Sequence, residues 1–534
     1  MKNILRFTAF AAPVLALLLC TAVLQAQNAA PVISNILAFP DELNNRVTVT
    51  FDVADAENDA LEIELRVSDN MGQTYLVDVS ETWGDVGYPV SAGSGKTLTW
   101  QYNPVALTSG IYFLKIIADD RQPIDIQAIV NEVNPNNLYN DLEFVQGIRH
   151  YDAGLEHIQE VKDAIETRFT NAGLQTHRQD FSVGAFSGQN IIGRLQGQGN
   201  ETQTVIIDAH FDSVAVAPGA DDNGSGVVGV LEALRVLSPY QFRNNIKFIG
   251  FDLEELGLLG SNAFINSPGG KDAFETISGV LNFEMIGYYS EVPNSQSTPI
   301  GFNLLFPDAY AELTANQFRG DFLINVANAA SAPLRNAFDS CAALYVPALK
   351  VTSLTVPGNG EIATDLRRSD HAKFWDAGMQ ALMLTDGANF RNIHYHTPTD
   401  VLDILDFNFM SNNVKATVAT AAHLAGIRHC STAVTAFNLI TGIENPVHHN
   451  NINFTLQPNP AGNSTMLILN NIYTKFLQAD IYNACGNLIM SKQIAPDAGN
   501  AANLLRTDAL ANGVYFVVLH NGQHKGVQKL IINK

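Results

Sequence analysis

The chain has 534 residues, enough for several domains, and 46% of them are apolar, enough for ordinary hydrophobic cores. Its formal net charge of −22 argues against non-specific binding to nucleic acid or to anionic membranes, because that binding needs an excess of Lys and Arg. Composition and charge therefore indicate a globular protein that is soluble outside the cell.

The first residues have the composition of a secretory signal peptide. Lys2 and Arg6 precede an apolar run over Ala11–Leu19, and the small residue Ala26 stands before Gln27. The run is too short to span a bilayer comfortably. We therefore expect a signal peptide over residues 1–26, export of the mature protein, and no transmembrane segment in it.

The four cysteines do not form a disulfide scaffold. Cys20 lies within the signal segment, where the preceding Leu18 and Leu19 are a poor lipoprotein signal. Cys341, Cys430 and Cys485 remain. A Cys341–Cys430 bridge stays open, because sequence does not give connectivity.

Residues 27–122 show the alternation of a β-sandwich. Apolar residues recur at every second position over 47–53 and 61–67, and again over 112–116. The pattern predicts antiparallel strands, and the stretch resembles the fibronectin type III and immunoglobulin-like modules of secreted bacterial enzymes. Residues 123–147 are expected to form a linker.

A turn between the first two of these strands is rich in carboxylates. Carboxylate side chains can bind calcium, and this stretch has four of them, Asp52, Asp55, Glu57 and Asp59. Turn and solvated-edge carboxylates are the commoner explanation of such a cluster, and we favour it here.

From residue 148 to 430 strands and helices alternate, which predicts an α/β fold. A helix is expected over Asp152–Asn171, with Asp152 as N-cap and Gly173 as its stop. The segments that follow are Val205–Ile207, Val227–Leu237, Ile246–Phe251, Val280–Phe283, Asp370–Ala377, Ala381–Leu384 and Val414–Ala425. The order predicts a mostly parallel mixed sheet flanked by helices. Residues 288–368 are proline-rich, and we expect an irregular insertion that shapes a substrate cleft.

Metal-competent side chains follow four of these strands. The groups are His210 with Asp222, Glu254 with Glu255, Glu284, and His394 with His396. Sites in open α/β sheets are built at the carboxyl ends of the strands. Two histidines and three carboxylates, one of them shared, are what two zinc ions in one site require.

The sequences of these segments resemble those of the co-catalytic di-zinc exopeptidase family. This family includes bacterial leucyl aminopeptidases, plasma glutamate carboxypeptidase and, in altered form, animal glutaminyl cyclases. The matching motifs are AHFDS (209–213), PGADDNGSG (218–226), FDLEELGLLGS (251–261), NFEMIG (282–287), SDHAKF (369–374) and HYHTPTD (394–400). The resemblance implies the zinc exopeptidase fold and two zinc ions per catalytic domain.

The same resemblance implies a role for each site residue. His210, Asp222 and Glu284 are expected to hold one zinc ion. Asp222, Glu255 and His396 are expected to hold the other, so that Asp222 bridges the two. His394 is the alternative to His396, which is favoured because it directly precedes the Thr-Pro pair.

Three further carboxylates have expected catalytic roles. Glu254 is adjacent to Glu255, so the two side chains diverge and Glu254 can serve as the general base. Asp212 is suited to orient the imidazole of His210. Asp370 is expected to support the site or relay a proton, and His371 is a weaker candidate for the same part.

The C-terminal segment has a different character. Residues 431–452 are polar and predict a linker, and residues 453–534 predict a small β-sandwich. Two of its segments resemble the C-terminal sorting domain of the type IX secretion system, namely LQPNPAGNSTMLIL and LANGVYFVVLHNGQHKGVQKLIINK. A carbohydrate-binding module is the alternative, but the segment lacks a row of exposed aromatic residues.

Together these observations predict a zinc-dependent exopeptidase, secreted or attached to the cell surface after passing through the periplasm. Its partners are peptide or protein substrates and the type IX secretion machinery. An aminopeptidase is favoured over a carboxypeptidase or a dipeptidase on the same site. A metal-free adhesin or receptor-like ectodomain is the alternative from another class, and a glutaminyl cyclase is less favoured because that activity uses one zinc ion.

Overall fold

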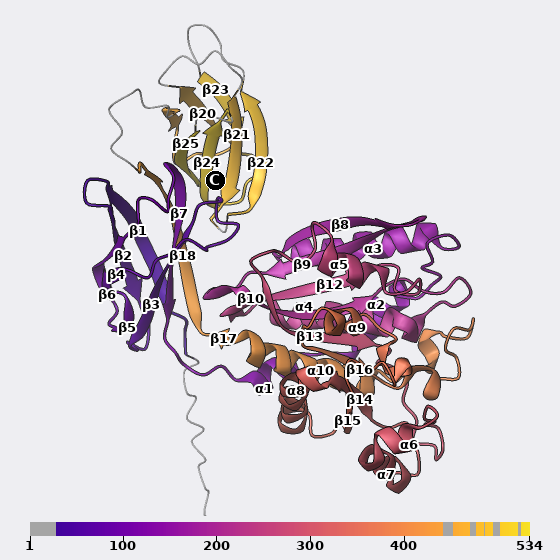
Figure 1. Cartoon of the computed structure of the whole chain (residues 1–534). Coiled ribbons are helices and arrows are strands. Elements are labelled where there is room, and N and C mark those ends of the chain that lie inside the picture. The colour runs from indigo at the N-terminus through magenta and orange to yellow at the C-terminus, as the bar shows by residue number, and fades with distance from the viewer. Residues whose placement is uncertain (1–27, 442–451, 470–476, 485, 495–501, 522–524) are drawn as a thin grey trace, which may run out of the picture.

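The computed structural model describes residues 28–441, 452–469, 477–484, 486–494, 502–521 and 525–534. The expected signal peptide, Cys20 and Cys485 lie outside these residues. The described chain forms an N-terminal β-sandwich, a large α/β unit and a C-terminal β-sandwich (Figure 1). Among its helices none combines the length and the apolar character that crossing a membrane would need.

The N-terminal sandwich consists of two four-stranded sheets. One sheet has the order β1 (Val32–Asp41), β2 (Arg46–Ala54), β6 (Gly93–Gln101), β4 (Thr82–Gly84). The other has the order β18 (Cys430–Leu439), β7 (Gly110–Asp119), β3 (Leu61–Ser68), β5 (Gly87–Val90). The alternating apolar residues of β2 and β3 are fully or almost fully buried between the sheets, as the period of two predicts.

The edge strand β18 shows that the expected linker over 431–452 is wrong at its start. β18 pairs antiparallel with β7 along its whole length, from Cys430 opposite Asp119 to Leu439 opposite Gly110. Phe437 stacks on Tyr112 with ring centroids 5.9 Å apart. The chain therefore returns from the α/β unit to complete the sandwich that it left about 310 residues earlier, and Figure 1 shows this strand beside β7.

An eight-stranded mixed sheet forms the centre of the α/β unit. Its order is β15 (Val351–Val356), β14 (Leu323–Asn328), β16 (Ala381–Thr385), β13 (Thr276–Glu284), β10 (Asn200–His210), β12 (Asn244–Phe251), β9 (Phe186–Leu195), β8 (Gln175–Val183). The four central strands β16, β13, β10 and β12 are mutually parallel. The predicted α/β class is confirmed. The expected irregular insertion over 288–368 is wrong, because β14 and β15 extend the sheet at its edge.

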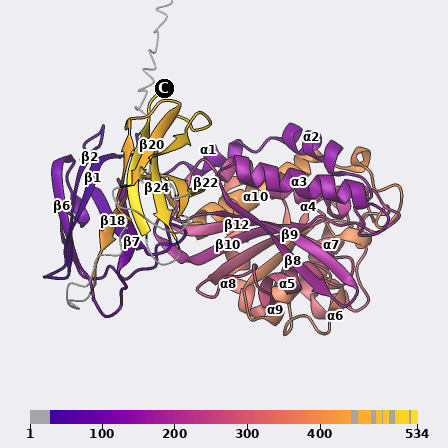
Figure 2. The same ribbon diagram turned by 90° about the horizontal axis from the view of Figure 1, so that it is seen from above.

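Helices cover both faces of this sheet (Figure 2). One face carries α1 (Ile126–Asn131), α2 (Pro135–Val145), α3 (Leu155–Asn171), α4 (Gly226–Leu237), α8 (Ala332–Tyr345) and α10 (Phe407–Ala425). The other carries α5 (Leu259–Asn266), α6 (Phe302–Leu305), α7 (Pro307–Ala315) and α9 (His371–Asp376). Helices on both faces keep the central strands dry, which explains their continuous apolar runs.

The expected linker over 123–147 is also wrong. It contains α1 and α2, and their residues Ile129, Val130, Leu138 and Leu142 are buried in the same core as α4 and α10. These two short helices therefore belong to the α/β unit.

Helix α3 begins three residues later than expected. Its N-cap is Gly154, because the backbone N–H groups of Asp152 and Ala153 donate to Nδ1 of His150 in a preceding turn. Gly173, with φ of +81°, follows the helix as expected, since this backbone conformation favours glycine.

The C-terminal sandwich packs on the N-terminal one. Its strands are β19 (Phe454–Gln457), β20 (Ser464–Leu469), β21 (Leu477–Asn483), β22 (Leu488–Ile494), β23 (Ala502–Arg506), β24 (Gly513–His520) and β25 (Lys525–Ile532). Phe516 of β24 contacts Phe113 of β7 edge to face, with centroids 5.6 Å apart. Elsewhere in the fold, the short strands β11 (Gln241–Phe242) and β17 (Ile427–Arg428) pair with each other. Cys341 and Cys430 are buried free thiols, so the bridge between them is not formed.

Candidate active site

Polar side chains gather where three neighbouring parallel strands end. His210 is the last residue of β10, and Glu284 is the last residue of β13. Glu254 and Glu255 follow β12 by a few residues. Because β10 lies between β12 and β13, these side chains meet at the carboxyl edge of the sheet.

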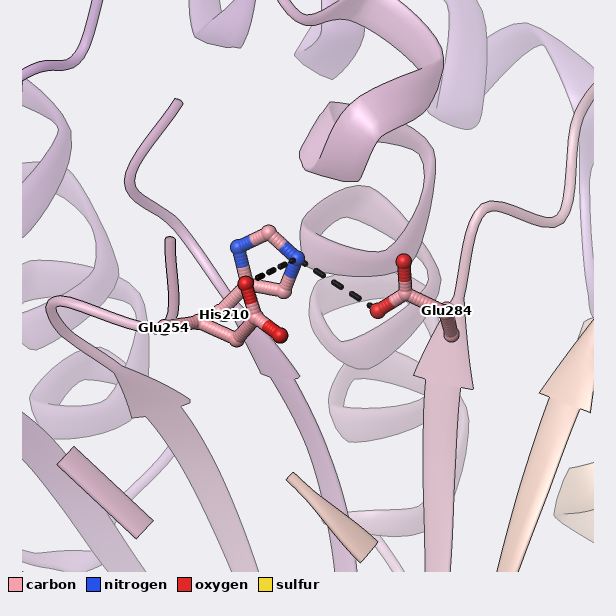
Figure 3. Close-up of side chains that lie close together, drawn as sticks. All are labelled: His210, Glu254 and Glu284. Atoms are coloured by element: carbon pink, nitrogen blue, oxygen red, sulfur yellow. Dashed lines mark ion pairs between the residues drawn. The ribbon is translucent and has the colours of Figure 1, made fainter. Parts of the chain in front are cut away.

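His210 is the centre of the first group. Its Nε2 lies 3.4 Å from Oε2 of Glu284 and 3.9 Å from Oε2 of Glu254 (Figure 3). The same nitrogen is 3.6 Å from Oδ1 of Asp222. The imidazole is fully buried, so these carboxylates surround it in a site of low dielectric.

His396 is the centre of the second group. Its Nε2 lies 3.0 Å from Oδ2 of Asp222 and 3.3 Å from Oε1 of Glu255. Asp222 thus turns one carboxylate oxygen towards each histidine. His394 takes no part in this group, because its Nδ1 lies 2.8 Å from the hydroxyl of Thr399.

The donor atoms of both groups fit a metal ion. Nε2 of His210, Oε2 of Glu284, Oε1 of Glu255 and Nε2 of His396 are buried and have no hydrogen-bond partner among the described residues. Buried polar atoms of this kind are normally paired. Imidazole nitrogens together with carboxylate oxygens are ligands that zinc accepts. The chain's own residues therefore fit zinc.

Burial also changes the proton affinities of the site. Burial, reinforced by the neighbouring Asp222, raises the pKa of Glu255 to about 7, and burial raises the pKa of Glu254 well above its usual range. For His396 burial acts in the opposite direction, but the carboxylates of Asp222 and Glu255 outweigh it and raise its pKa to about 9. Burial is thus the main cause for the two glutamates, and the neighbouring carboxylates decide the direction for His396.

Asp212 organises both sides of the site. Its two carboxylate oxygens accept hydrogen bonds from the backbone N–H groups of Glu254, at 3.0 Å, and Glu255, at 3.1 Å. Its Oδ1 also lies 3.4 Å from Nδ1 of His210. Asp212 is therefore placed to orient the imidazole and to hold the Glu-Glu pair.

Asp370 and His371 lie at the start of α9 and differ in their surroundings. Asp370 is fully buried, and burial raises the pKa of its carboxyl to about 7. The imidazole of His371 contacts the carbonyl of Leu366 at 3.0 Å and packs edge to face on Trp375. Burial lowers the pKa of His371 to about 3, so this imidazole is neutral at neutral pH and packs in the core. Its contacts do not support the weaker expectation that it assists the site as Asp370 does.

Two residues that sequence reasoning did not single out hold the loop of Asp222. Asp400 accepts hydrogen bonds from the backbone N–H groups of Asp221 and Asp222, at 2.9 and 3.1 Å. The buried guanidinium of Arg149 donates to five carbonyl oxygens, those of Val145, Gly147, Phe211, Pro218 and Gly219. Asp400 is the last residue of the motif HYHTPTD, so the motif could have pointed to it. Arg149 lies in none of the motifs, and the sequence gives no indication of its role.

An apolar pocket adjoins the first group. Glu284 lines one part of it, and the walls come from Phe302, Leu313, Phe322, Leu354, Leu366 and Met383. Arg368 and Tyr395 line it as well, and Arg368 donates a 2.6 Å hydrogen bond to the Tyr395 hydroxyl. Most of these wall residues come from residues 288–368, for which the sequence predicted an irregular insertion.

Two adjoining histidine-and-carboxylate groups at the carboxyl edge of an α/β sheet are typical of a metal-dependent hydrolase. Residues 190–421 match the model of peptidase family M28, and residues 455–533 match the model of the secretion system C-terminal sorting domain. Residues 190–421 are therefore a peptidase family M28 domain, the chain is a metallopeptidase, and its C-terminal unit is a type IX sorting domain.

Individual proteins are also similar to this chain. A probable leucine aminopeptidase of Arthroderma otae is 29% identical over 319 residues, covering 56% of this chain and 75% of that protein. The uncharacterized protein YfbL of Escherichia coli is 28% identical over 284 residues, covering 49% and 80%. The crystal structure of the LapA aminopeptidase of Legionella pneumophila aligns with a TM-score of 0.44 at 21% identity, covering 57% and 75%.

Proposed function

We propose that the chain is an exported aminopeptidase that removes N-terminal residues with apolar side chains, using two zinc ions. One ion would be held by His210, Glu284 and Asp222, and the other by His396, Glu255 and Asp222. The observation that carries this proposal is the position of Asp222, whose two oxygens face the two histidines at 3.6 and 3.0 Å.

Zinc at this position would acidify a water molecule and polarise the scissile carbonyl. The chain's own residues supply the rest of the chemistry. Glu254 takes a proton from the attacking water and returns it to the leaving amine, a task that suits a carboxyl whose pKa burial has raised. Asp212 keeps the imidazole of His210 and the backbone of Glu254 in position. Asp370 is fully buried beside the site, and because burial raises the pKa of its carboxyl to about 7, it can take up or release a proton there near neutral pH.

The balance of charge supports a free amino group as the recognised end of the substrate. The two groups contain four carboxylates, Asp222, Glu254, Glu255 and Glu284, which equal the charge of two zinc ions. Asp212 and Asp400 add two further carboxylates, which outnumber the charged guanidinium of Arg149 beside them. A positively charged N-terminus is therefore attracted and a C-terminal carboxylate is repelled.

The apolar pocket supports the side-chain preference. A residue bound with its carbonyl at the metal-binding groups would place its side chain beside Glu284, where Phe322, Leu354 and Met383 line the wall. Each buried methylene adds about 0.8 kcal/mol. We therefore expect leucine or phenylalanine at the first position to be favoured over alanine.

A carboxypeptidase is the second candidate, because Arg368 lines the same pocket. An arginine there can hold a C-terminal carboxylate through paired hydrogen bonds. Its guanidinium already contacts Tyr395 and Asn389, which leaves part of its donor capacity free for a substrate.

A peptide panel tests the proposal. We expect leucyl p-nitroanilide to be cleaved with a kcat/KM roughly 10–100 times that of alanyl p-nitroanilide. N-acetyl-leucyl p-nitroanilide should not be cleaved, because its amino group is blocked. Cleavage of N-blocked peptides with a free carboxyl end, together with loss of that activity in Arg368→Ala, would establish the carboxypeptidase instead.

Export is the last part of the proposal. The sorting domain supports passage through the periplasm to the type IX machinery, followed by release or surface attachment. Deleting residues 453–534 should leave active enzyme in the periplasm. Equal activity of the deleted and complete proteins outside the cell would contradict this route.

A further inference from the structure

A third carboxylate cluster lies in the N-terminal sandwich, where the chain leaves it for the α/β unit. Asp55 and Asp59 are in the turn between β2 and β3, and Asp120 directly follows β7. Each offers one carboxylate oxygen, and the three oxygens lie within 4.8 Å of one another. Asp55 and Asp59 share one turn, and the fold brings Asp120 to them from 61 residues further along the chain.

One oxygen of this cluster is buried and unpaired. The side chain of Asp55 is 9% exposed, and its Oδ1 accepts a 2.7 Å hydrogen bond from the backbone N–H of Asp59. Its Oδ2 is buried without a hydrogen-bond partner among the described residues. A buried carboxylate oxygen without a donor is costly, and a cation removes that cost.

Asp120 is held in place from the other side. Its Oδ2 accepts a 2.7 Å hydrogen bond from the amide of Asn28 and lies 2.6 Å from Nδ1 of His429. Its Oδ1 accepts from the backbone N–H of Gln122 at 2.9 Å. His429 supplies at most one positive charge against three carboxylates, so the cluster keeps an excess of negative charge.

From this geometry we infer a calcium site formed by Asp55, Asp59 and Asp120, in place of the solvated turn that the sequence favoured for Asp55 and Asp59. All three donors are oxygens, which hard cations prefer and for which zinc has less preference. Oxygens on opposite sides of a calcium ion are about 4.8 Å apart at Ca–O distances of about 2.4 Å. Three oxygens that lie within 4.8 Å of one another can therefore contact a single calcium ion. Magnesium needs a tighter octahedron and keeps most of its water molecules.

The site joins segments that meet at the boundary between two units. Asp120 begins the segment that leads to α1, and His429 lies in the segment that returns to β18. The backbone N–H of Asp120 donates to the carbonyl of His429 at 3.4 Å. A calcium ion here ties the turn between β2 and β3 to this crossing, and so stiffens the connection between the sandwich and the peptidase unit.

Calorimetric titration of the zinc-saturated, full-length protein with calcium chloride tests the inference. We expect one calcium ion per chain with a Kd of about 10⁻⁴–10⁻³ M, the range of extracellular modules. Asp59→Asn should weaken binding at least about tenfold, because it removes one of three charged ligands. The backbone N–H of residue 59 still reaches Asp55 in this variant, so the turn is kept.

Asp52→Asn is the matched control. Asp52 lies on β2, three residues before Asp55, but its oxygens accept hydrogen bonds from Asn35 and Gly95 instead of joining the cluster. Its affinity for calcium should equal that of the unaltered protein. No binding by the unaltered protein, or equal losses in Asp59→Asn and Asp52→Asn, would overturn the site. A third zinc ion that Asp59→Asn removes would overturn its assignment to calcium.

Discussion

At the scale of single residues, Asp222 connects the two halves of the site, because one of its carboxylate oxygens faces His210 and the other faces His396. Its backbone is held by Asp400, and Asp400 is itself buried. Glu254 and Glu255 divide two tasks in a similar way. Glu255 faces His396 at 3.3 Å, while Glu254 lies 3.9 Å from His210 on the other side.

Glu254→Gln tests that division of tasks. Glutamine keeps the size of the side chain but cannot accept the proton of the attacking water. We expect kcat to fall about 10²–10⁴-fold, with the zinc content measured by mass spectrometry unchanged. Loss of zinc in this variant would show that Glu254 is a ligand, as its place beside His210 and Glu284 also permits.

The chemistry of these residues could be predicted from the sequence because each one lies at the end of an apolar strand or in the loop that follows it. His396 could be preferred to His394 only through the resemblance, since both stand in the same loop. Arg149 could not be predicted, because its contacts with Phe211, Pro218 and Gly219 exist only after strands and loops that are 60 to 70 residues apart have packed.

At the scale of elements, one buried cation ties together several chain segments at the carboxyl edge of the sheet. Arg149 is fully buried and donates to five carbonyl oxygens, from the end of α2 to the loop that follows β10. Burial lowers the pKa of its guanidinium to about 10, which still leaves it charged at neutral pH.

Arg149→Lys should therefore be far from conservative. Lysine keeps the charge but has three donors and no planar fork, so several buried carbonyls lose their partner. We expect the thermal midpoint of the peptidase unit to fall by about 5–10 °C, together with most of the activity. Calorimetry and kinetics on the same sample measure both.

Arg168→Lys is the control for this substitution. Arg168 lies on α3 and pairs with Asp141 at the surface, where an ion pair contributes about 0–1 kcal/mol. Its midpoint and activity should change little. An unchanged midpoint in Arg149→Lys would mean that the loops hold their shape without it.

Elements with strong periodicity, such as α4 and β12, could be predicted to within a few residues. β14 and β15 could not, since the six prolines between residues 288 and 368 suggested irregular chain. The prolines lie in the loops and first turns around these strands, which leaves the backbone N–H groups of both strands available for pairing.

At the scale of the whole molecule, the chain passes through the N-terminal sandwich twice. Arg428 joins the units at the second passage, donating to Asp119 at 2.6 Å and to Glu64 at 2.7 Å. Lys115 of β7 forms a buried ion pair with Glu201 of β10 at 3.3 Å. The sequence could not predict this arrangement, because the partners are separated by 86 to 364 residues.

Two truncated proteins test the double passage. One ends after Thr441 and keeps β18, and the other ends after His429 and lacks it. We expect the longer protein to keep full activity and to stay in solution without aggregating. The shorter one should unfold at a lower temperature and aggregate, because β7 gains an open edge and the core loses Phe437 and Leu439. Equal behaviour on heating and in size-exclusion chromatography would contradict the role of β18.

The central claim is that two zinc ions share Asp222, and counting zinc in purified protein tests it most directly. The unaltered chain should hold about two zinc ions, and Asp152→Asn, which alters an exposed aspartate, should hold the same number. Asp222→Asn should hold fewer than about one and lose its activity, because asparagine cannot offer a charged oxygen to each ion. Retention of both ions and of normal activity in Asp222→Asn would contradict the account.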